Sequence, residues 1–271
     1  MRLKADMPSA VVIDLPLGEG VNPPDVAYPL DHALLRRNRI VGFAQTNELA
    51  HPYMVLRSQL LRHAKMSGMR VFAVTSAQPG NGKTHVAVNL AAALSRLHPT
   101  ILVDLDLRRP SVGQRIGLGH GKAGIDDYLD GTVGLAQCAT PIEGYDLTVH
   151  AAREHRGNAE ELLCGTALAD FVATVRATEN DPICIIDTPP ALVHDDLMLI
   201  ARTIDGVLMV VEEGRTPKRA LRQAIGALTP TPVIGSVLNM ALSPSSGASY
   251  AYAYGQADAP SSPLDRERAP L

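Results

Sequence analysis

The stretch VFAVTSAQPGNGKTHVAVNLAAAL, residues 71–94, decides the fold. It begins as an apolar run typical of a buried parallel strand, continues as a loop with Gly80 and Gly82, and ends in an Ala-rich helix opened by Lys83 and Thr84. Glycines let such a loop turn its backbone N–H groups inward, and the helix N-terminus adds a positive dipole. We therefore predict a phosphate-binding loop, in preference to a chance connection between a strand and a helix.

The nucleotide contacts expected of this loop follow from its chemistry. Lys83 reaches the β- and γ-phosphates of ATP, and the Thr84 hydroxyl can ligate Mg²⁺. The usual pattern has glycine five residues before Gly82, where this chain has Ala77, another small residue. The loop residues predicted to bind the nucleotide are Ala77, Gln78, Pro79, Gly80, Asn81, Gly82, Lys83, Thr84 and His85.

The rest of the chain alternates short β-rich runs with longer helical patterns, which predicts an α/β fold. Four more almost continuous apolar runs indicate parallel strands buried on both faces, at 100–106, 183–188, 206–211 and 232–239. Helical patterns lie at 84–97, 159–178, 193–203 and 216–228, an amphipathic helix starts near Pro52, and short helices are expected within 113–131. The prediction is a P-loop NTPase with a mostly parallel sheet and helices on both faces.

Three segments follow from composition. Residues 1–46 are predicted to be a mostly irregular N-terminal arm, residues 47–242 the P-loop domain, and residues 243–271 a flexible tail rich in Ser, Ala, Pro and Gly. The 271 residues, 46% of them hydrophobic, suffice for one substantial core.

Charge and residue usage exclude several classes of protein. With 25 Lys and Arg against 28 Asp and Glu, nothing in the overall charge favours binding to nucleic acid or to an anionic membrane. No apolar run approaches the roughly 20 residues of a membrane span, and the N-terminus lacks a signal peptide, so a cytoplasmic location is expected. The three cysteines and nine histidines show no metal-site or disulfide spacing.

Acidic residues end two of the predicted strands. Asp104 and Asp106 follow the apolar run at 100–103 and share a side if the strand continues, while Asp187 ends the run at 183–186. A lone aspartate there is usually an ordinary strand-terminal residue. Three of them beside a P-loop favour carboxylates that serve a nucleotide and its metal ion.

Taken together, these motifs resemble the bacterial protein-tyrosine autokinases of exopolysaccharide and capsule synthesis, and most closely their stand-alone cytoplasmic members encoded beside exosortase systems. SAQPGNGKT is similar to the Walker A motif of that family, ILVDLDLRRPS to its second acidic motif and IIDTPP to its Walker B motif. The similarity extends from about Arg37 to Gly255 and includes GIDDYL at 124–129, AEELL at 159–163 and VVEEGRTP at 210–217.

The resemblance implies ATP-dependent phosphorylation of tyrosine on a neighbouring copy. By this resemblance, Asp104 is the base towards the tyrosine hydroxyl, and Thr84, Asp106 and Asp187 bind the metal ion. Arg108 would assist electrostatically, although the Arg108-Arg109 pair could also be simply solvated. Asn239 would contact adenine, unless it is only a cap. The catalytic set implied is Lys83, Asp104, Asp106, Arg108 and Asp187.

The tail carries the acceptors that this activity needs. Three of the seven tyrosines, Tyr250, Tyr252 and Tyr254, alternate with alanine in SYAYAYG. Such alternation also suits a β-edge or a sticky low-complexity patch. Flanking Ser, Gly and Pro favour a mobile segment, whose ten residues from Leu242 to Tyr252 span at most about 35 Å when extended.

The resemblance also implies partners. Members of the family assemble into rings through Glu-x-x-Arg-x-x-Arg, but this chain has His51, Met54 and Arg57 at those positions, so only the last residue matches. Glu48 and Arg62 could substitute one turn along. A separate membrane polysaccharide co-polymerase, or chain-length activator, is expected to recruit the chain to the inner face of the plasma membrane.

Two other functions compete with the kinase. A partitioning or division-site ATPase of the same fold carries a signature lysine at the position of Gln78, which this chain lacks. A non-catalytic ATP-binding regulator would need none of the three aspartates, and all three are present. Both alternatives remain open on sequence alone.

Overall fold

A computed structural model describes residues 27–44, 48–119 and 123–241. Contacts within the chain divide it after Asn239, and the fold described below belongs to the unit Met1–Asn239. The tyrosines of the predicted tail lie outside the described residues, as do positions 1–26 of the predicted arm.

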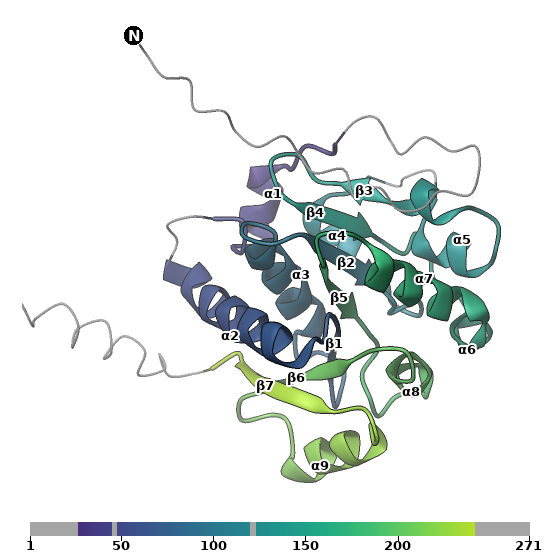
Figure 1. Cartoon of the computed structure of the whole chain (residues 1–271). Coiled ribbons are helices and arrows are strands. Elements are labelled where there is room, and N and C mark those ends of the chain that lie inside the picture. Colours follow the sequence, from purple (N-terminus) through teal and green to yellow (C-terminus); the bar gives the residue numbers. More distant parts are fainter. Residues whose placement is uncertain (1–26, 45–47, 120–122, 242–271) are drawn as a thin grey trace, which may run out of the picture. The chain divides into compact units, whose positions relative to one another are not determined.

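A seven-stranded sheet in the order β3-β4-β2-β5-β1-β6-β7 organises the unit. All pairings are parallel except that of β3 with β4. Strand β1 lies inside the sheet, between β5 and β6, and its carboxyl end leads directly into the phosphate loop (Figure 1). The strands are β1 (Val71–Ser76), β2 (Thr100–Asp104), β3 (Thr140–Pro141), β4 (Leu147–His150), β5 (Ile183–Asp187), β6 (Gly206–Glu212) and β7 (Val233–Asn239).

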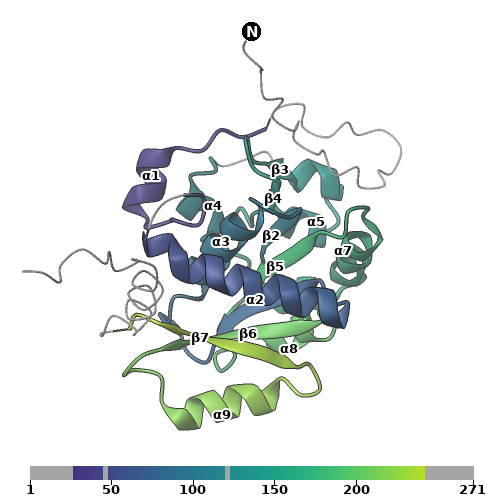
Figure 2. The same cartoon turned by 60° about the vertical axis from the view of Figure 1, so that its left-hand side comes forward.

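Helices cover both faces of the sheet, as predicted. One core contains Phe72 and Val74 of β1 with the buried sides of α1 to α4, and the other contains Val71 and Ala73 with those of α5 to α9. Figure 2 shows α2 lying along α3. The helices are α1 (His32–Arg37), α2 (His51–Ser67), α3 (Lys83–Leu94), α4 (Val112–Ile116), α5 (Ile125–Leu129), α6 (Ala159–Cys164), α7 (Thr166–Ala177), α8 (Asp196–Ala201) and α9 (Lys218–Ala227), with 3₁₀ turns at Glu48–Ala50 and Leu135–Cys138.

Part of the segment predicted as an irregular arm packs into the core. Leu35 of α1, Ile40 and Phe43 are all buried on the face that α3 occupies. The Asn89 side chain of α3 accepts the backbone N–H groups of Val41 and Gly42 at 2.7 and 2.9 Å. Residues 27–44 therefore form part of the folded unit, because their apolar side chains complete the cover of the sheet.

The structure differs from the sequence prediction in two strands and one helix. Strands β3 and β4 were not foreseen, since neither contains the long apolar run by which the buried strands were found. The single helix expected over 159–178 is divided into α6 and α7, because Gly165 between them has an extended backbone, with φ −66° and ψ 169°.

His150 of β4 is a histidine enclosed in the core. It is fully buried, and its ring contacts that of Phe171 edge-on with centroids 5.6 Å apart. Its Nδ1 lies 3.5 Å from the sulfur of Cys138. Burial lowers the pKa of His150 to about 4, because the charged imidazolium loses its hydration.

We predict that His150 makes the fold acid-sensitive. Between the unfolded pKa, roughly 6.5, and the folded value of about 4, the unfolded chain binds a proton that the folded chain does not. Stability is therefore lost as the pH falls through this window, by about 2 kcal/mol at pH 5. Chemical denaturation of wild type and His150→Gln at pH 7.5 and pH 5 measures the difference. A wild type that loses no more stability than the variant would contradict the prediction.

Candidate active site

The loop between β1 and α3 has the backbone of a phosphate cradle. Gly80 and Gly82 have φ of 87° and 85°, in the left-handed region that favours glycine. Gly82 is the N-cap of α3, and the first N–H bonded within the helix is that of Val86, to Gly82 at 3.0 Å. The N–H groups of Lys83, Thr84 and His85 thus point out of the helix, where a phosphate can receive them.

Ala77 fits the position where the pattern has glycine. Its side chain is fully buried in the core. The described non-glycine residues with positive φ are Arg39, Asn180, Asp181 and Met240, so the backbone at Ala77 does not need a glycine. The alanine is therefore compatible with the loop.

The loop is braced from the neighbouring strand ends. Asn239, at the end of β7, donates from Nδ2 to the carbonyl of Asn81 at 2.9 Å. The Asn81 amide donates in turn to Glu212 of β6 at 2.9 Å, and its own Oδ1 is buried without a hydrogen bond. Asn239 is thus within reach of the loop, and here its side chain supports the backbone of the cradle.

Lys83 joins the loop to the carboxylates. Its Nζ lies 2.6 Å from Oδ2 of Asp106 and 3.7 Å from Oδ1 of Asp187. Its side chain is only 12% exposed. Burial opposes the charged form of Lys83, but the negative charges of Asp187, Asp106 and Asp104 together raise its pKa. The lysine therefore stays cationic, as phosphate binding requires.

Asp187 is a buried carboxylate whose oxygens receive no hydrogen bond. It ends β5 in register with Asp104 of β2, because these two strands are parallel neighbours. Burial raises the pKa of Asp187, against the opposing charge of Lys83. An enclosed carboxylate whose oxygens receive no hydrogen bond is suited to holding a cation.

Asp104 accepts hydrogen bonds from the backbone at the turn that follows β2. Oδ2 accepts the N–H groups of Ser111 and Val112, both at 2.9 Å, and Oδ1 accepts that of Asp106 at 3.2 Å. Burial, and then the charge of Asp187, raise the pKa of Asp104 to about 8. The side chain holds the turn from β2 into α4, and it lines neither cavity of this edge.

Arg108 is bound by a carboxylate of α8. Its Nε and Nη2 lie 2.7 and 3.0 Å from the two carboxylate oxygens of Asp196, which is fully buried. The guanidinium therefore ties the acidic loop to α8 while also contributing to the wall of the cavity beside the P-loop.

A cavity of about 320 Å³ opens beside Lys83. The lining combines charged and polar groups with apolar ones, which include two prolines that follow β5 and a half-exposed valine. The lining residues are Lys83, Asp106, Arg108, Arg109, Ser111, Pro79, Gly80, Pro189, Pro190, Val193 and His194.

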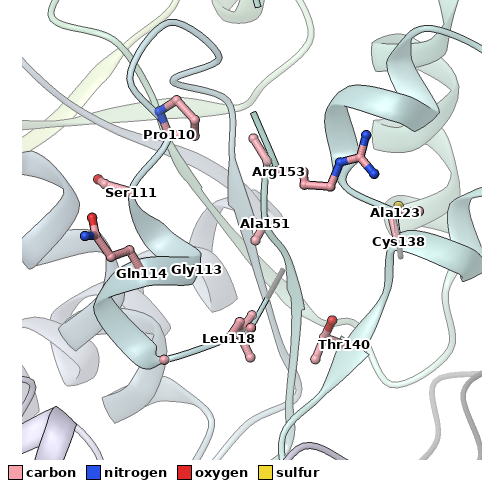
Figure 3. A pocket seen from close by; sticks show the side chains of 13 residues that line it. Pro110, Ser111, Gly113, Gln114, Leu118, Ala123, Cys138, Thr140, Ala151 and Arg153 are labelled. Carbon is pink, nitrogen blue, oxygen red and sulfur yellow. The ribbon is translucent and has the colours of Figure 1, made fainter. Parts of the chain in front are cut away.

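A second cavity, of about 460 Å³, shares Ser111 with the cavity beside Lys83. In Figure 3, Ser111, Gly113 and Gln114 line one side and Ala123 and Cys138 the other, with Ala151 and Arg153 between. Ser111 donates towards the Thr84 hydroxyl over 3.4 Å. The turn at 110–111 therefore separates the two cavities.

The residues present fit a magnesium ion bound together with a nucleotide. Within the described chain no three His, Cys, Asp or Glu side chains converge to hold a metal by themselves. Mg²⁺ at a nucleotide needs only one or two protein ligands, because phosphates and water complete its shell. The Thr84 hydroxyl and the Asp187 oxygens, which receive no hydrogen bond, are the groups that would supply such ligands.

Fold and site together define a P-loop NTPase. A family model of the ParA group, described as NUBPL iron-transfer P-loop NTPase, matches residues 68–260. The solved structure of the septum site-determining protein MinD from Pyrococcus horikoshii, in complex with Mg-ADP, has a TM-score of 0.53 at 17% identity over 62% of this chain and 69% of its own, a likeness of fold.

Other relatives identify a narrower family within the P-loop NTPases. CpsD, a tyrosine-protein kinase of Streptococcus pneumoniae serotype 4, is 32% identical over 66% of this chain and 81% of its own length. The tyrosine-protein kinase YwqD of Bacillus subtilis is 26% identical over 76% and 90%. The VpsO kinase domain superimposes with a TM-score of 0.64 at 31% identity, over 70% and 93%. The chain belongs to the bacterial tyrosine-protein kinase family.

Some relatives are much longer. The succinoglycan biosynthesis transport protein ExoP of Rhizobium meliloti is 30% identical over 75% of this chain, which spans only 26% of ExoP. The similarity thus covers the P-loop unit and not the whole of such proteins. Within the described residues, no helix combines the length and apolar character that a bilayer crossing demands.

The structure gathers most of the predicted residues and adds others. Lys83, Thr84, Asp106 and Asp187 lie together at the carboxyl edge of the sheet, whereas the His85 ring faces away from the loop, against Tyr53 and Asn89. Four further residues at the site were not predicted from the sequence: Ser111, Asp196, Glu212 and Arg156. Ser111 and Glu212 had a local signal, since they lie in the quoted motifs ILVDLDLRRPS and VVEEGRTP.

We predict that the Arg108–Asp196 pair is a structural clamp. Arg108→Ala leaves a buried carboxylate without its cation and should cost roughly 2–4 kcal/mol of unfolding free energy. Asp196→Asn should cost a similar amount, and the double variant less than the sum, because the two residues act as one unit. Urea denaturation of the four proteins gives the coupling. Strict additivity would show that the pair contributes nothing beyond its separate residues.

Proposed function

We propose that this protein is an ATP-dependent protein-tyrosine autokinase that regulates the synthesis or export of an exopolysaccharide or capsule. The observation that carries the proposal is the pairing of Lys83 with Asp106 at a cavity that prolines also line. Such a cavity can accept an aromatic ring against the prolines while the ring's hydroxyl meets the carboxylate. The naming of YwqD and CpsD as tyrosine-protein kinases supports the same activity.

ATP is the proposed phosphate donor and Mg²⁺ its counter-ion. A cobyrinic acid a,c-diamide synthase of the same fold has been solved with an ATP analogue and magnesium, which supports this pairing in the fold. The N–H groups that open α3 would hold the phosphates, and Lys83 would exchange Asp106 for phosphate oxygens. Thr84 and Asp187 would hold Mg²⁺, which would supply positive charge against the phosphates.

The proposed transfer needs a proton acceptor for the phenol. The tyrosine oxygen bonds to the γ-phosphorus, the bond from that phosphorus to the β-phosphate oxygen breaks, and ADP leaves. An unperturbed tyrosine has a pKa near 10, so a carboxylate must take the proton as attack proceeds. We assign this role to Asp106, which lines the cavity, and not to Asp104, whose oxygens serve the turn at 111–112.

The proposed acceptors are Tyr250, Tyr252 and Tyr254 of a neighbouring copy. Their segment is long enough to leave one domain and reach another, at about 35 Å for ten extended residues. Each added phosphate contributes nearly two negative charges, which would repel the carboxylates of the site and favour release.

Self-association and a membrane partner belong to the same proposal. The surface of α2 is open, with a broad groove of about 510 Å³ that includes His51, Met54 and Arg57. Arg57 already donates to the carbonyl of Ala93 at 3.3 Å, so it is engaged within the chain. We propose that copies meet near α2, and that a membrane polysaccharide co-polymerase recruits the protein to the inner face of the plasma membrane.

The principal test is phosphorylation in trans. A tail-less protein ending at residue 241 is mixed with Lys83→Met protein that retains its tail, together with Mg-ATP, and modified residues are mapped by mass spectrometry. We expect phosphate on Tyr250, Tyr252 or Tyr254 of the Lys83→Met chain, at least tenfold above that chain incubated alone. Replacing the three tyrosines with phenylalanine is the control and should abolish the signal.

The same experiment separates the kinase from its rival. A ParA-type ATPase would release inorganic phosphate steadily while leaving every tail tyrosine unmodified. That outcome, obtained also with a candidate membrane activator present, would replace the kinase proposal. Loss of phosphotransfer on addition of EDTA, and its return with excess Mg²⁺, is expected in the kinase case.

A further inference from the structure

The acidic loop that carries Asp106 is anchored on both sides of that residue. On one side, the N–H of Leu105 donates to the carbonyl of Asp187 at 2.8 Å, which joins the loop to β5. On the other, the carbonyl of Leu107 accepts the N–H of Arg156 at 2.8 Å. The second anchor comes from the segment between β4 and α6, which lines the phosphate site with none of its residues.

That segment makes another contact with the same loop. Nδ1 of His155 lies 2.7 Å from the carbonyl of Arg108, and because a carbonyl only accepts, Nδ1 carries the proton. Residues 155 and 156 therefore hold two successive carbonyls of the acidic loop, directly after Asp106.

The segment is itself fixed by two carboxylates of α5. Arg156 donates from Nε to Asp126 at 2.9 Å and from Nη2 to Asp127 at 2.5 Å. Asp126 is fully buried, and its other oxygen accepts the N–H of Arg153 at 2.9 Å. Paired N–H donors of a guanidinium impose a direction that a single ammonium does not, which makes Arg156 a directional clamp.

Gly124 permits this close approach. A Cβ at Gly124 would lie 2.2 Å from Oδ1 of Asp126 and 2.8 Å from the nitrogen of Arg153. Its N–H also binds Oδ2 of Asp127 at 2.9 Å. Gly124, Asp126 and Asp127 thus form one binding site on α5 and its N-cap for the segment at 153–156.

We infer that Arg156, held by Asp126 and Asp127, is a positioning residue that sets the place of Asp106 beside Lys83. The chain of contacts runs from α5 through the Arg156 side chain to its backbone N–H, then to the carbonyl next to Asp106. The inference rests on the proposed function for the reaction concerned. The physical link from Arg156 to the acidic loop does not depend on what that reaction is.

Hydrogen–deuterium exchange tests the link without any activity. In Arg156→Lys, which keeps the charge and loses the fork, we expect amide exchange within 104–112 to rise at least tenfold, while exchange within 77–85 stays within twofold. The matched control is Arg176→Lys, whose guanidinium binds Asp205 at 2.6 Å near the amino ends of β1 and β6. Unchanged exchange in 104–112, or an equal rise in both segments, would overturn the inference.

Kinetics then tests the consequence for the site. Phosphotransfer, or ATP hydrolysis if no tyrosine is modified, should lose about tenfold in kcat in Arg156→Lys, because a small misplacement of a reacting group is costly. KM for ATP should stay within about twofold, since the phosphate cradle is untouched. His155→Ala should lose about threefold in kcat, and Arg176→Lys should match wild type.

A second variant serves as the control for a loss of folding. If Arg156→Lys unfolds, the double variant Asp126→Asn with Arg156→Gln removes both charges and leaves no buried carboxylate unpaired. A folded variant of either kind that keeps wild-type kcat refutes the positioning role. An inactive wild type would refute the proposed kinase and leave the exchange result to decide this inference.

Discussion

The buried cluster of Lys83 with Asp106 and Asp187 is the interaction on which the site depends. A single ammonium lies among carboxylates that are almost entirely removed from water, an arrangement that burial makes costly unless further positive charge arrives. The Asp187 oxygens are buried without a hydrogen bond, so their negative charge is also incompletely compensated. A metal ion bound together with a nucleotide would offset this excess of negative charge.

The parallel sheet creates this cluster, because it brings the carboxyl ends of β1, β2 and β5 to one edge. Asp104 pairs in register with Asp187, and Val74 of the central strand pairs with Asp187 from the other side. The three strands are far apart in the chain, yet each contributes its last residues to a region a few ångströms wide. Around it, Asn239, Arg156 and Asp196 hold the loops from outside, so the precision of the site depends on contacts with elements at the periphery of the fold.

The three aspartates have the same carboxylate group but different surroundings, and their surroundings distinguish what each can do. The oxygens of Asp104 accept backbone N–H groups at a turn, Asp187 is enclosed near Lys83, and of the three only Asp106 lines the cavity beside the P-loop. The family's motifs supply all three carboxylates, and the contacts of each carboxylate in the fold make it different from the other two. This division also explains why Arg108, although part of the motif, is engaged by Asp196 and serves the loop as much as the cavity.

The sequence by itself determined the parts of this protein that depend on local pattern. Apolar runs located β1, β2, β5, β6 and β7, and the residues of SAQPGNGKT specified a phosphate loop because its glycines and helix start act over a few residues. Strands β3 and β4, the break at Gly165 and the packing of residues 27–44 needed tertiary contacts that no short window contains. Only the folded structure decided which aspartate faces the cavity and that Arg156 supports it, because hydrogen bonds between residues 30 to 90 positions apart exist only once the sheet has brought them together.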